Sequence, residues 1–397
     1  MDKLFFILYG AIVTLLYILA LPFLFWFSKR KSKYKISIPS RFFLKENSPL
    51  SADGIWFHSC SFGEARAIYP VLDKLPNELL RLTTTTQTGY EAISIKQSKE
   101  SRYLPFEPLL FYWLKPQKVL VVMEAEFWYL LFALAQKRGA KTLLINARMS
   151  DRSFPKYKKM SWFYRIIFTH IDEVYAQSKL DGERLIELGA KNVRVIGNIK
   201  LANIPKETKQ LSKPKALLIC AGSTHEGEEE IILDAYAKLK EEDPSAKLVI
   251  VPRHPERFGL VSKMVKEFAR EYHYTWHNYS DNEAFNSDIL VVDLLGELIN
   301  IYAISDIVIL GGAFAKVGGH NAAEAAQFGC KIISGEHYFN QKDIFSMIEG
   351  IAIVTESNLA RRLQQHGLLI PTKIIQRTDI EPILNSIEME IEYGKSI

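Results

Sequence analysis

The side chains best suited to chemistry stand where apolar strands are predicted to end. Glu64 follows the strand 55–58 through a Ser-Phe-Gly turn, and Glu124 and Glu126 come directly after the apolar run 119–123. Ligands of α/β proteins bind beyond the carboxyl ends of the strands, so these carboxylates are candidates for one site. A partly buried carboxylate with a raised pKa suits general-base chemistry. Glu64 is the candidate base, and a first-turn acid favoured by the helix dipole is the alternative.

Glu124 and Glu126 are two positions apart, so one points into the predicted site and the other away from it. A carboxylate at the end of a buried strand is a poor core residue, which favours a functional role for Glu124. Two carboxylates beside a sugar would also fit glycoside hydrolysis, because sequence spacing does not give their separation. Lys200 follows a later strand and is the candidate cation of this site, with an ordinary surface lysine as the alternative.

A second group of candidates follows strands in the later half of the chain. Arg253 and Arg257 come after the strand 248–251 and predict an anion site, because arginine grips a phosphate or carboxylate through two nitrogens. A solvated basic turn is the alternative. His225 and His320 each stand beside a predicted helix start, where neither makes a metal-like cluster with its neighbours, so we interpret them as hydrogen-bonding groups.

Residues 311–335 form a glycine-rich segment that runs from an apolar strand to a short helix opened by Asn321. Glycines let the backbone approach a ligand closely, and a helix start offers free N–H groups, which together suit a phosphate. Asn321 and Glu324 are spaced as a helix cap and its acidic partner, or else Glu324 accepts two sugar hydroxyls of a nucleotide. The segment is not a G-x-G-x-x-G fingerprint, so by itself it does not indicate a dinucleotide.

These candidates are positioned by strands and helices that alternate through two stretches of similar length. The pattern predicts an α/β fold with two Rossmann-like, doubly wound parallel sheets facing across a cleft, joined by a polar linker at 204–215. We expect a membrane anchor over 1–30, an N-terminal acceptor domain over 31–204 and a C-terminal nucleotide-sugar domain over 205–397. An NAD-dependent oxidoreductase is an alternative, which the missing glycine fingerprint disfavours.

The anchor is predicted from residues 4–27, which contain no charged side chain. At about 1.5 Å per residue, a helix over this run is long enough to cross a hydrocarbon core of about 30 Å. A cleaved signal peptide is the alternative, with a shorter apolar core of about 7–15 residues. The basic residues that follow are Lys29, Arg30, Lys31, Lys33 and Lys35, and they place the next segment on the cytoplasmic side. Pro22 could kink the helix, so a position partly in the interface stays open.

The composition is that of a folded protein: 397 residues, 48% hydrophobic and 24% charged, with a net charge of +5 that is too small to indicate nucleic acid. Cys60, Cys220 and Cys330 lie far apart beside strands, which predicts small buried residues in a reducing compartment. Basic and aromatic residues are interleaved over 148–168. That stretch suits a membrane interface, base stacking or a packed amphipathic helix, and the neighbouring anchor favours the first.

Ordered motifs along the chain resemble those of the 3-deoxy-D-manno-octulosonic acid (Kdo) transferases of lipid A assembly. They are HSCSFGE (58–64), TTTTQTG (83–89), MEAEFW (123–128), NARMSDRS (146–153), LGAKNVRVIGNIK (188–200), STHEGEEE (223–230), VPRHPER (251–257) and GGHNAAEAAQFG (318–329). Each motif is weak alone, but the ordered set is specific and covers nearly the whole chain. The resemblance implies a GT-B glycosyltransferase that moves Kdo, with inversion, from CMP-Kdo to a lipid A precursor such as lipid IVA.

The resemblance also implies roles for single residues. Glu64 is expected to take the proton from the acceptor hydroxyl, while Glu124 and Lys200 stabilise the transition state. The positions expected to contact CMP are Pro252, Arg253, Leu295, Gly296, Glu297, Asn321, Ala322, Ala323 and Glu324, the last of them on the ribose. No cofactor or metal is expected, because a CMP phosphate already leaves well and needs mainly a positioned base and cations.

The chain departs from the family's usual pattern in four places: Ala125 for a Thr, Tyr129 for a Pro, Ala322-Ala323 for Pro-Leu, and Glu107 for an Asp. These changes spare the catalytic carboxylates and bear on acceptor specificity. The implied partners are CMP-Kdo, the lipid acceptor and membrane lipids at the cytoplasmic face of the inner membrane. The alternatives are a GT-B enzyme that uses another nucleotide sugar, and a non-catalytic lipid-binding protein that would leave Glu64 and the arginines unexplained.

Overall fold

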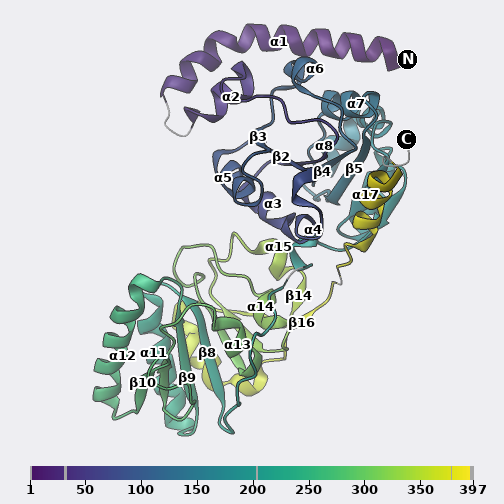
Figure 1. Ribbon diagram of the computed structural model, residues 1–397. Coiled ribbons are helices and arrows are strands. Elements are labelled where there is room, and N and C mark those ends of the chain that lie inside the picture. Colours follow the sequence, from purple (N-terminus) through teal and green to yellow (C-terminus); the bar gives the residue numbers. More distant parts are fainter. Residues whose placement is uncertain (1, 31–33, 203, 377, 394–397) are drawn as a thin grey trace. The chain divides into compact units, whose positions relative to one another are not determined.

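The structure is a computed structural model that describes residues 2–30, 34–202, 204–376 and 378–393. The chain forms two compact units, Met1–Asn203 with Arg377–Ile397, and Ile204–Gln376. Each unit is built on its own seven-stranded sheet (Figure 1). Lys31 and Lys33 of the basic segment lie outside the described residues.

The sheet of the first unit is parallel throughout, in the order β3-β2-β1-β4-β5-β6-β7. Its strands are β1 (Ile55–Ser59), β2 (Leu80–Thr84), β3 (Ser101–Tyr103), β4 (Val119–Met123), β5 (Lys141–Ala147), β6 (Glu173–Ala176) and β7 (Val193–Val195). Its helices are α1 (Asp2–Arg30), α2 (Ser37–Phe43), α3 (Phe62–Ala67), α4 (Tyr69–Leu72), α5 (Gln87–Lys96), α6 (Leu110–Trp113), α7 (Tyr129–Lys137), α8 (Phe154–Lys159), α9 (Ser161–Phe168), α10 (Lys179–Glu187) and α17 (Glu381–Tyr393).

Strand β4 shows why this sheet is buried on both faces. Val119, Val121 and Met123 pack in the core on one side, and Leu120 and Val122 pack in the core on the other. All five side chains are fully buried. A continuous apolar run is typical of a parallel strand that is covered by helices on both faces.

The sheet of the second unit is also parallel, in the order β10-β11-β9-β8-β12-β13-β15. Its strands are β8 (Leu218–Thr224), β9 (Lys247–Pro252), β10 (Trp276–Asn278), β11 (Ile289–Val291), β12 (Ile307–Leu310), β13 (Lys331–Ser334) and β15 (Ala352–Ile353). Its helices are α11 (Glu228–Glu242), α12 (Phe258–Tyr272), α13 (Leu298–Ile304), α14 (Ala323–Ala326), α15 (Lys342–Phe345) and α16 (Leu359–Gln364). A small antiparallel pair, β14 (Ile348–Glu349) with β16 (Lys373–Ile374), lies apart from it.

Each sheet changes direction of winding beside its first strand. In the first unit β1 lies between β2 and β4, and in the second β8 lies between β9 and β12. Such a switch point leaves a crevice at the carboxyl ends of the two flanking strands, where ligands of this fold class bind. Glu64 and Glu124 follow β1 and β4, and the glycine-rich segment follows β12.

Helix α17 belongs to the first unit, although the sequence placed residues 205–397 together in a C-terminal domain. Ile383, Leu384 and Ile387 form its apolar stripe and, with Ile380 just before the helix, pack in the core that covers one face of the first sheet. The Asp379 N–H donates to the Ile196 carbonyl at 2.8 Å, and the Tyr175 hydroxyl donates to the Pro382 carbonyl at 2.9 Å. The apolar spacing of this helix is visible in the sequence, but the sheet on which it packs is decided by contacts with distant residues.

Candidate active site

Glu64 lies in the first turn of α3, next to the N-cap residue Ser61. The Ser61 hydroxyl accepts from the Glu64 N–H at 3.3 Å and donates to Glu64 Oε1 at 2.8 Å. The Cys60 N–H donates to Glu64 Oε2 at 2.7 Å. The turn therefore fixes the carboxylate through one backbone donor and one hydroxyl; it differs from a capping box, because the backbone donor is the residue before the N-cap.

Burial makes Glu64 a stronger base than an exposed glutamate. Removal from water, together with the charges of Glu124 and Glu126, raises the pKa of its carboxyl to about 6, against the lowering effect of the Cys60 and Ser61 hydrogen bonds. The carboxylate is therefore mostly ionised at pH 7 and holds a proton more tightly than usual, which suits a general base.

The loop after β2 braces the same turn. The hydroxyls of Thr84, Thr85 and Thr86 donate to the Cys60 carbonyl at 3.2, 3.1 and 3.0 Å. Thr85 also lies 2.8 Å from the Cys60 thiol, so Cys60 is half-buried and hydrogen-bonded, while Cys220 and Cys330 are buried as the sequence predicted. Together these contacts hold the backbone just before Glu64.

Glu124 and Lys200 come together across neighbouring parts of the first unit. Lys200 Nζ lies 4.0 Å from Glu124 Oε1, with both side chains mostly buried. Glu124 has a φ of +54°, a strained value for a residue with a side chain, and its N–H donates to the Ile145 carbonyl at 3.0 Å. Strain of this kind persists where the surrounding structure holds it, often at functional sites. Glu126 instead accepts from the Trp128 indole at 2.7 Å.

Three buried amide side chains hold the turn that carries Lys200, and the sequence analysis did not single them out. Asn146 Oδ1 accepts from the Ile199 N–H at 3.1 Å, and Asn198 Oδ1 accepts from the Lys200 N–H at 3.0 Å. Gln177 links them, donating to the Asn146 carbonyl and accepting from Asn198 Nδ2, both at 3.0 Å. These amides fix the direction in which Lys200 leaves the backbone.

In the second unit, Arg253 and Arg257 have different surroundings. The Arg257 guanidinium makes two bonds, of 2.6 and 2.9 Å, to the fully buried carboxylate of Glu229. Arg253 is exposed at the end of β9, where its backbone N–H donates to the Thr224 carbonyl at 3.0 Å. Of the two arginines predicted to bind an anion, Arg257 therefore binds a carboxylate of the protein itself. Arg253 remains the candidate for binding the anion of a ligand.

The glycine-rich segment is held by a protein carboxylate. Glu228 is fully buried and accepts from the N–H groups of Gly312, Phe314 and Ala315 at 2.8, 3.0 and 3.0 Å, and from His225 at 2.9 Å. These donors are therefore taken by the protein itself, and the phosphate site stays a prediction for the helix start near Asn321. The helix that follows, α11, begins at Glu228, with Gly227 as its cap at a φ of +85°.

The end of the segment leaves Glu324 beside a cation. Asn321 Oδ1 accepts from the Ala323 N–H at 3.1 Å, and Asn321 Nδ2 lies 3.4 Å from Glu324 Oε1. The two side chains therefore interact as the sequence suggested, but the N-cap of α14 is Ala322 and not Asn321. Burial raises the pKa of Glu324, while the Asn321 hydrogen bond and the Arg253 charge lower it. Arg253 and Glu324 are therefore close enough to feel each other's charge, as two groups that contact one nucleotide need to be.

The third predicted CMP segment, 295–297, follows β11 in the same sheet. Leu295 is 71% exposed and Gly296 has a φ of +90°. Glu297 faces inward, with Lys209 Nζ at 3.2 Å and Asn300 Nδ2 at 3.0 Å. The backbone of Leu295 and Gly296 is thus open to a ligand, and the Glu297 carboxylate is already paired.

A histidine pair lies beside Arg253. His225 Nε2 and His320 Nε2 are 2.8 Å apart, with the rings nearly parallel, and His254 packs edge-on against His225. One ring must donate and the other accept, so the two are not both protonated. Burial and the neighbouring charges of His225, Arg253 and His254 lower the pKa of His320 to about 4. The pair is a hydrogen-bonding group, as predicted, and no metal-binding cluster of His, Cys, Asp and Glu occurs among the described residues.

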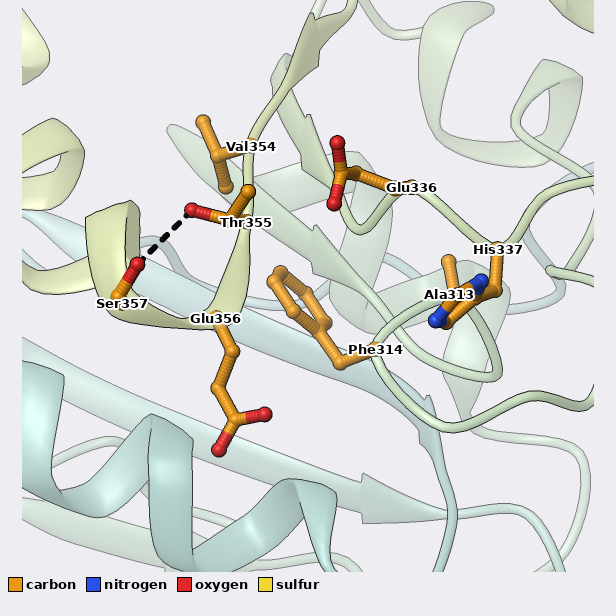
Figure 2. Close-up of a pocket in the computed structure, with 8 residues that line it drawn as sticks. All are labelled: Ala313, Phe314, Glu336, His337, Val354, Thr355, Glu356 and Ser357. Atoms are coloured by element: carbon orange, nitrogen blue, oxygen red, sulfur yellow. Dashed lines mark hydrogen bonds between the residues drawn. The ribbon is translucent and has the colours of Figure 1, made fainter.

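The second unit also holds a cavity of about 420 Å³, drawn in Figure 2. Ala313 and Phe314 reach it from the loop after β12, Glu336 and His337 from the loop after β13, and residues 354–357 from the loop after β15. None of the residues predicted to bind CMP lines this cavity, so it lies apart from the Arg253–Glu324 region.

Comparisons with known proteins identify the family. Residues 34–203 match the family described as 3-deoxy-D-manno-octulosonic-acid transferase (kdotransferase). The chain is 32% identical to the 3-deoxy-D-manno-octulosonic acid transferase of Haemophilus influenzae, over 98% of this chain and 92% of that protein. It is 33% identical to the transferase of that name from Rickettsia bellii, over 73% and 72% of the two chains.

Among solved structures, the chain is similar to the C-terminal CMP-Kdo binding domain of WaaA from Acinetobacter baumannii. The identity is 25%, with a TM-score of 0.33, over 46% of this chain and 84% of that domain. The two Rossmann-like units define a two-domain glycosyltransferase of the GT-B class with an apolar N-terminal helix. The chain belongs to the 3-deoxy-D-manno-octulosonic acid transferase family, which acts in lipopolysaccharide biosynthesis.

Proposed function

We propose that this protein transfers Kdo from CMP-Kdo to a lipid A precursor such as lipid IVA, in a single inverting step with Glu64 as the base. The observation that carries the proposal is the Glu64 carboxylate, half-buried at the switch point of the first sheet with its pKa raised to about 6. The relatives named above support the class of donor, and the length and apolar composition of α1 support a lipid acceptor at the cytoplasmic face of the inner membrane.

In the proposed step, Glu64 takes the proton from the acceptor hydroxyl as its oxygen bonds to the anomeric carbon of Kdo. The bond from that carbon to the CMP phosphate oxygen breaks, and CMP leaves with the electron pair. Attack opposite to the leaving group inverts the anomeric centre. Glu124 and Lys200, 4.0 Å apart, supply a fixed pair of charges that stabilises charge separation in the transition state.

In the same proposal the second unit binds the CMP portion of the donor. Arg253 offers an exposed guanidinium to the phosphate, and Glu324 offers a carboxylate to the ribose hydroxyls. Pro252, the backbone of Leu295 and Gly296, and the turn from Asn321 to Ala323 complete the proposed contacts. Glu297 acts indirectly, because its carboxylate already binds Lys209 and Asn300.

The test compares Glu64→Gln with Glu126→Gln, which removes a charge of the same sign nearby. Each purified protein is incubated with CMP-Kdo and detergent-dispersed lipid IVA, and the lipid is followed by mass spectrometry. Glu64→Gln is expected to lower turnover about 10²–10⁴-fold with CMP binding retained, the range typical for loss of a general base. Equal losses in the two variants, or full turnover in Glu64→Gln, would refute the assignment. Replacing CMP-Kdo by a UDP-sugar tests the alternative donor.

A further inference from the structure

Helix α1 packs on the first unit along its whole length. Near its start, the Tyr9 hydroxyl donates to the buried carboxylate of Glu107 at 2.7 Å, and the rings of Phe5 and Tyr9 lie 5.1 and 4.9 Å from that of Tyr129. Farther along, the Tyr17 hydroxyl donates to the Phe42 carbonyl. Figure 1 shows the helix lying beside α2 and α6 of this unit.

Near the other end of α1, the rings of Phe25 and Phe43 are 6.5 Å apart. These contacts span Phe5 to Phe25, which at about 1.5 Å per residue is close to 30 Å, the thickness of a hydrocarbon core. A helix that crossed the membrane would have to leave the unit over that distance. It would strip Tyr9 from Glu107 and uncover Phe111 and Phe163, which pack against the main core.

The opposite face of α1 is apolar and exposed. Its large side chains are between 48% and 73% exposed: Leu4, Ile7, Leu8, Ile12, Leu15, Leu16, Ile18, Leu19, Phe23 and Trp26. Trp162, whose ring lies 6.4 Å from that of Phe5, extends this face and is 59% exposed. An apolar surface of this extent marks an interaction site, since soluble monomers rarely expose one.

Cations border this face at its carboxyl end. A hollow of about 600 Å³ is lined by Phe25, Ser28, Lys29, Lys35, Pro39, Phe43 and Lys45. The Lys29 ammonium lies 4.2 Å from the centre of the Phe25 ring, at the junction between the apolar helix and the basic rim. Apolar side chains with lysines at their edge match the boundary between lipid acyl chains and anionic headgroups.

We propose that α1 lies in the plane of one membrane leaflet, with its outward face among the acyl chains and the lysines of the hollow on anionic headgroups. The protein would therefore be held on one face of the membrane without crossing it. The long uncharged run that predicted a spanning helix is explained by two apolar partners, because one side of the helix packs on protein and the other meets lipid. This inference does not depend on the transfer chemistry.

The main test is the sidedness of the helix ends. Lys3→Cys and Lys29→Cys are made in a background with the native cysteines replaced, and each is labelled with a membrane-impermeant maleimide in sealed vesicles of known orientation. An in-plane helix exposes both positions on the same side. Labelling from opposite sides would overturn the proposal.

A second test measures lipid binding directly. In the full-length protein, Leu15→Lys/Leu19→Lys is expected to lower binding to phosphatidylethanolamine–phosphatidylglycerol vesicles at least tenfold with an unchanged circular dichroism spectrum, because both side chains are exposed. Lys29→Gln/Lys45→Gln should weaken binding to these vesicles and not to neutral phosphatidylcholine. Unchanged binding in the leucine variant, or a stable dimer that loses its contact in that variant, would contradict the proposal. Transfer to detergent-dispersed lipid reports separately on the proposed function.

Discussion

Glu64 and Glu228 occupy equivalent places in the two units and serve different ends. Each lies in the first turn of the helix that follows the first strand of its sheet, and each accepts from a backbone N–H a few residues earlier, Cys60 at 2.7 Å and His225 at 2.9 Å. Glu228 is fully buried and takes three further N–H groups from the segment after β12. Glu64 is half-buried and gains only the Ser61 hydroxyl.

The difference lies in how many donors each carboxylate has. A carboxylate with four backbone donors has no capacity left for a substrate and fixes a loop instead. One with two donors and partial burial keeps its affinity for a proton. Two similar helix starts can therefore carry a structural and a chemical glutamate, and the surrounding chain decides which is which.

The largest expected effect is that of Glu228→Ala, which tests whether Glu228 has a structural role. The change leaves four buried N–H groups without their acceptor, so we expect a loss of about 3–5 kcal/mol in the free energy of unfolding of the second unit, with weaker CMP binding. Thermal and denaturant unfolding measure the loss. Glu230→Ala, an exposed acid in the same turn, is the matched control and should change stability by less than about 0.5 kcal/mol. Similar stability in the two variants would contradict the structural role of Glu228.

The two arginines after β9 show the same contrast between a residue that stabilises the fold and one that is proposed to bind a ligand, with a smaller expected effect. Arg253→Ala is expected to weaken CMP binding about 10–100-fold at an unchanged melting temperature, because a charged hydrogen bond contributes about 1.5–3 kcal/mol. Arg257→Ala should instead lower the melting temperature, because it strands the buried Glu229 carboxylate. Calorimetric titration with CMP and thermal unfolding of both variants separate the two roles, and the reverse pattern would show that they are exchanged.

Substitutions of the amides around Lys200 test whether the site of the first unit depends on the orientation of the Lys200 side chain as well as on its charge. Asn198→Ala removes the acceptor of the Lys200 N–H and should lower kcat about tenfold with KM for CMP-Kdo nearly unchanged, because small misplacements of catalytic groups are costly. Asn198→Asp keeps the acceptor oxygen and should recover part of the rate. An equal loss in both variants, accompanied by lower thermal stability, would point to a folding defect.

The smallest effect is the pH dependence that Glu64 confers. Its folded-state pKa of about 6 is above the ordinary 4.5, so transfer should fall as pH drops through 6 and level off above it. The same shift makes the folded state bind the proton more tightly, so stability should decrease as pH rises from 4.5 to 6. Glu64→Gln should lack this slope and be the more stable protein above pH 6. A transfer rate that does not change between pH 5 and 7 would show that Glu64 does not take the proton.

The sequence predicted the parallel sheets well, because continuous apolar runs such as 119–123 determine buried strands locally. Local signals also located Glu64 at a helix start and the contact between Asn321 and Glu324, although the N-cap of α14 is Ala322. The features that the sequence did not reveal depend on contacts between residues far apart in the chain. Glu228 binds donors 84–87 positions away, so nothing near it showed that the glycine-rich segment is filled by a side chain. The short edge strands β3, β10 and β15 carry too few residues for a periodic pattern.

The return of α17 to the first unit means that the chain passes between the units twice, near residues 204 and 377. A single backbone cut at 205–212 would therefore give two pieces that still share a buried interface, since Ile383 and Ile387 stay anchored in the first core. A protein expressed from residue 205 onward would carry helix α17 with its apolar face exposed, because the core on which that face packs would be missing. Residues 204–376 are the better unit for isolating the half that we propose to bind CMP, and a tag at the carboxyl end would be attached to the first unit.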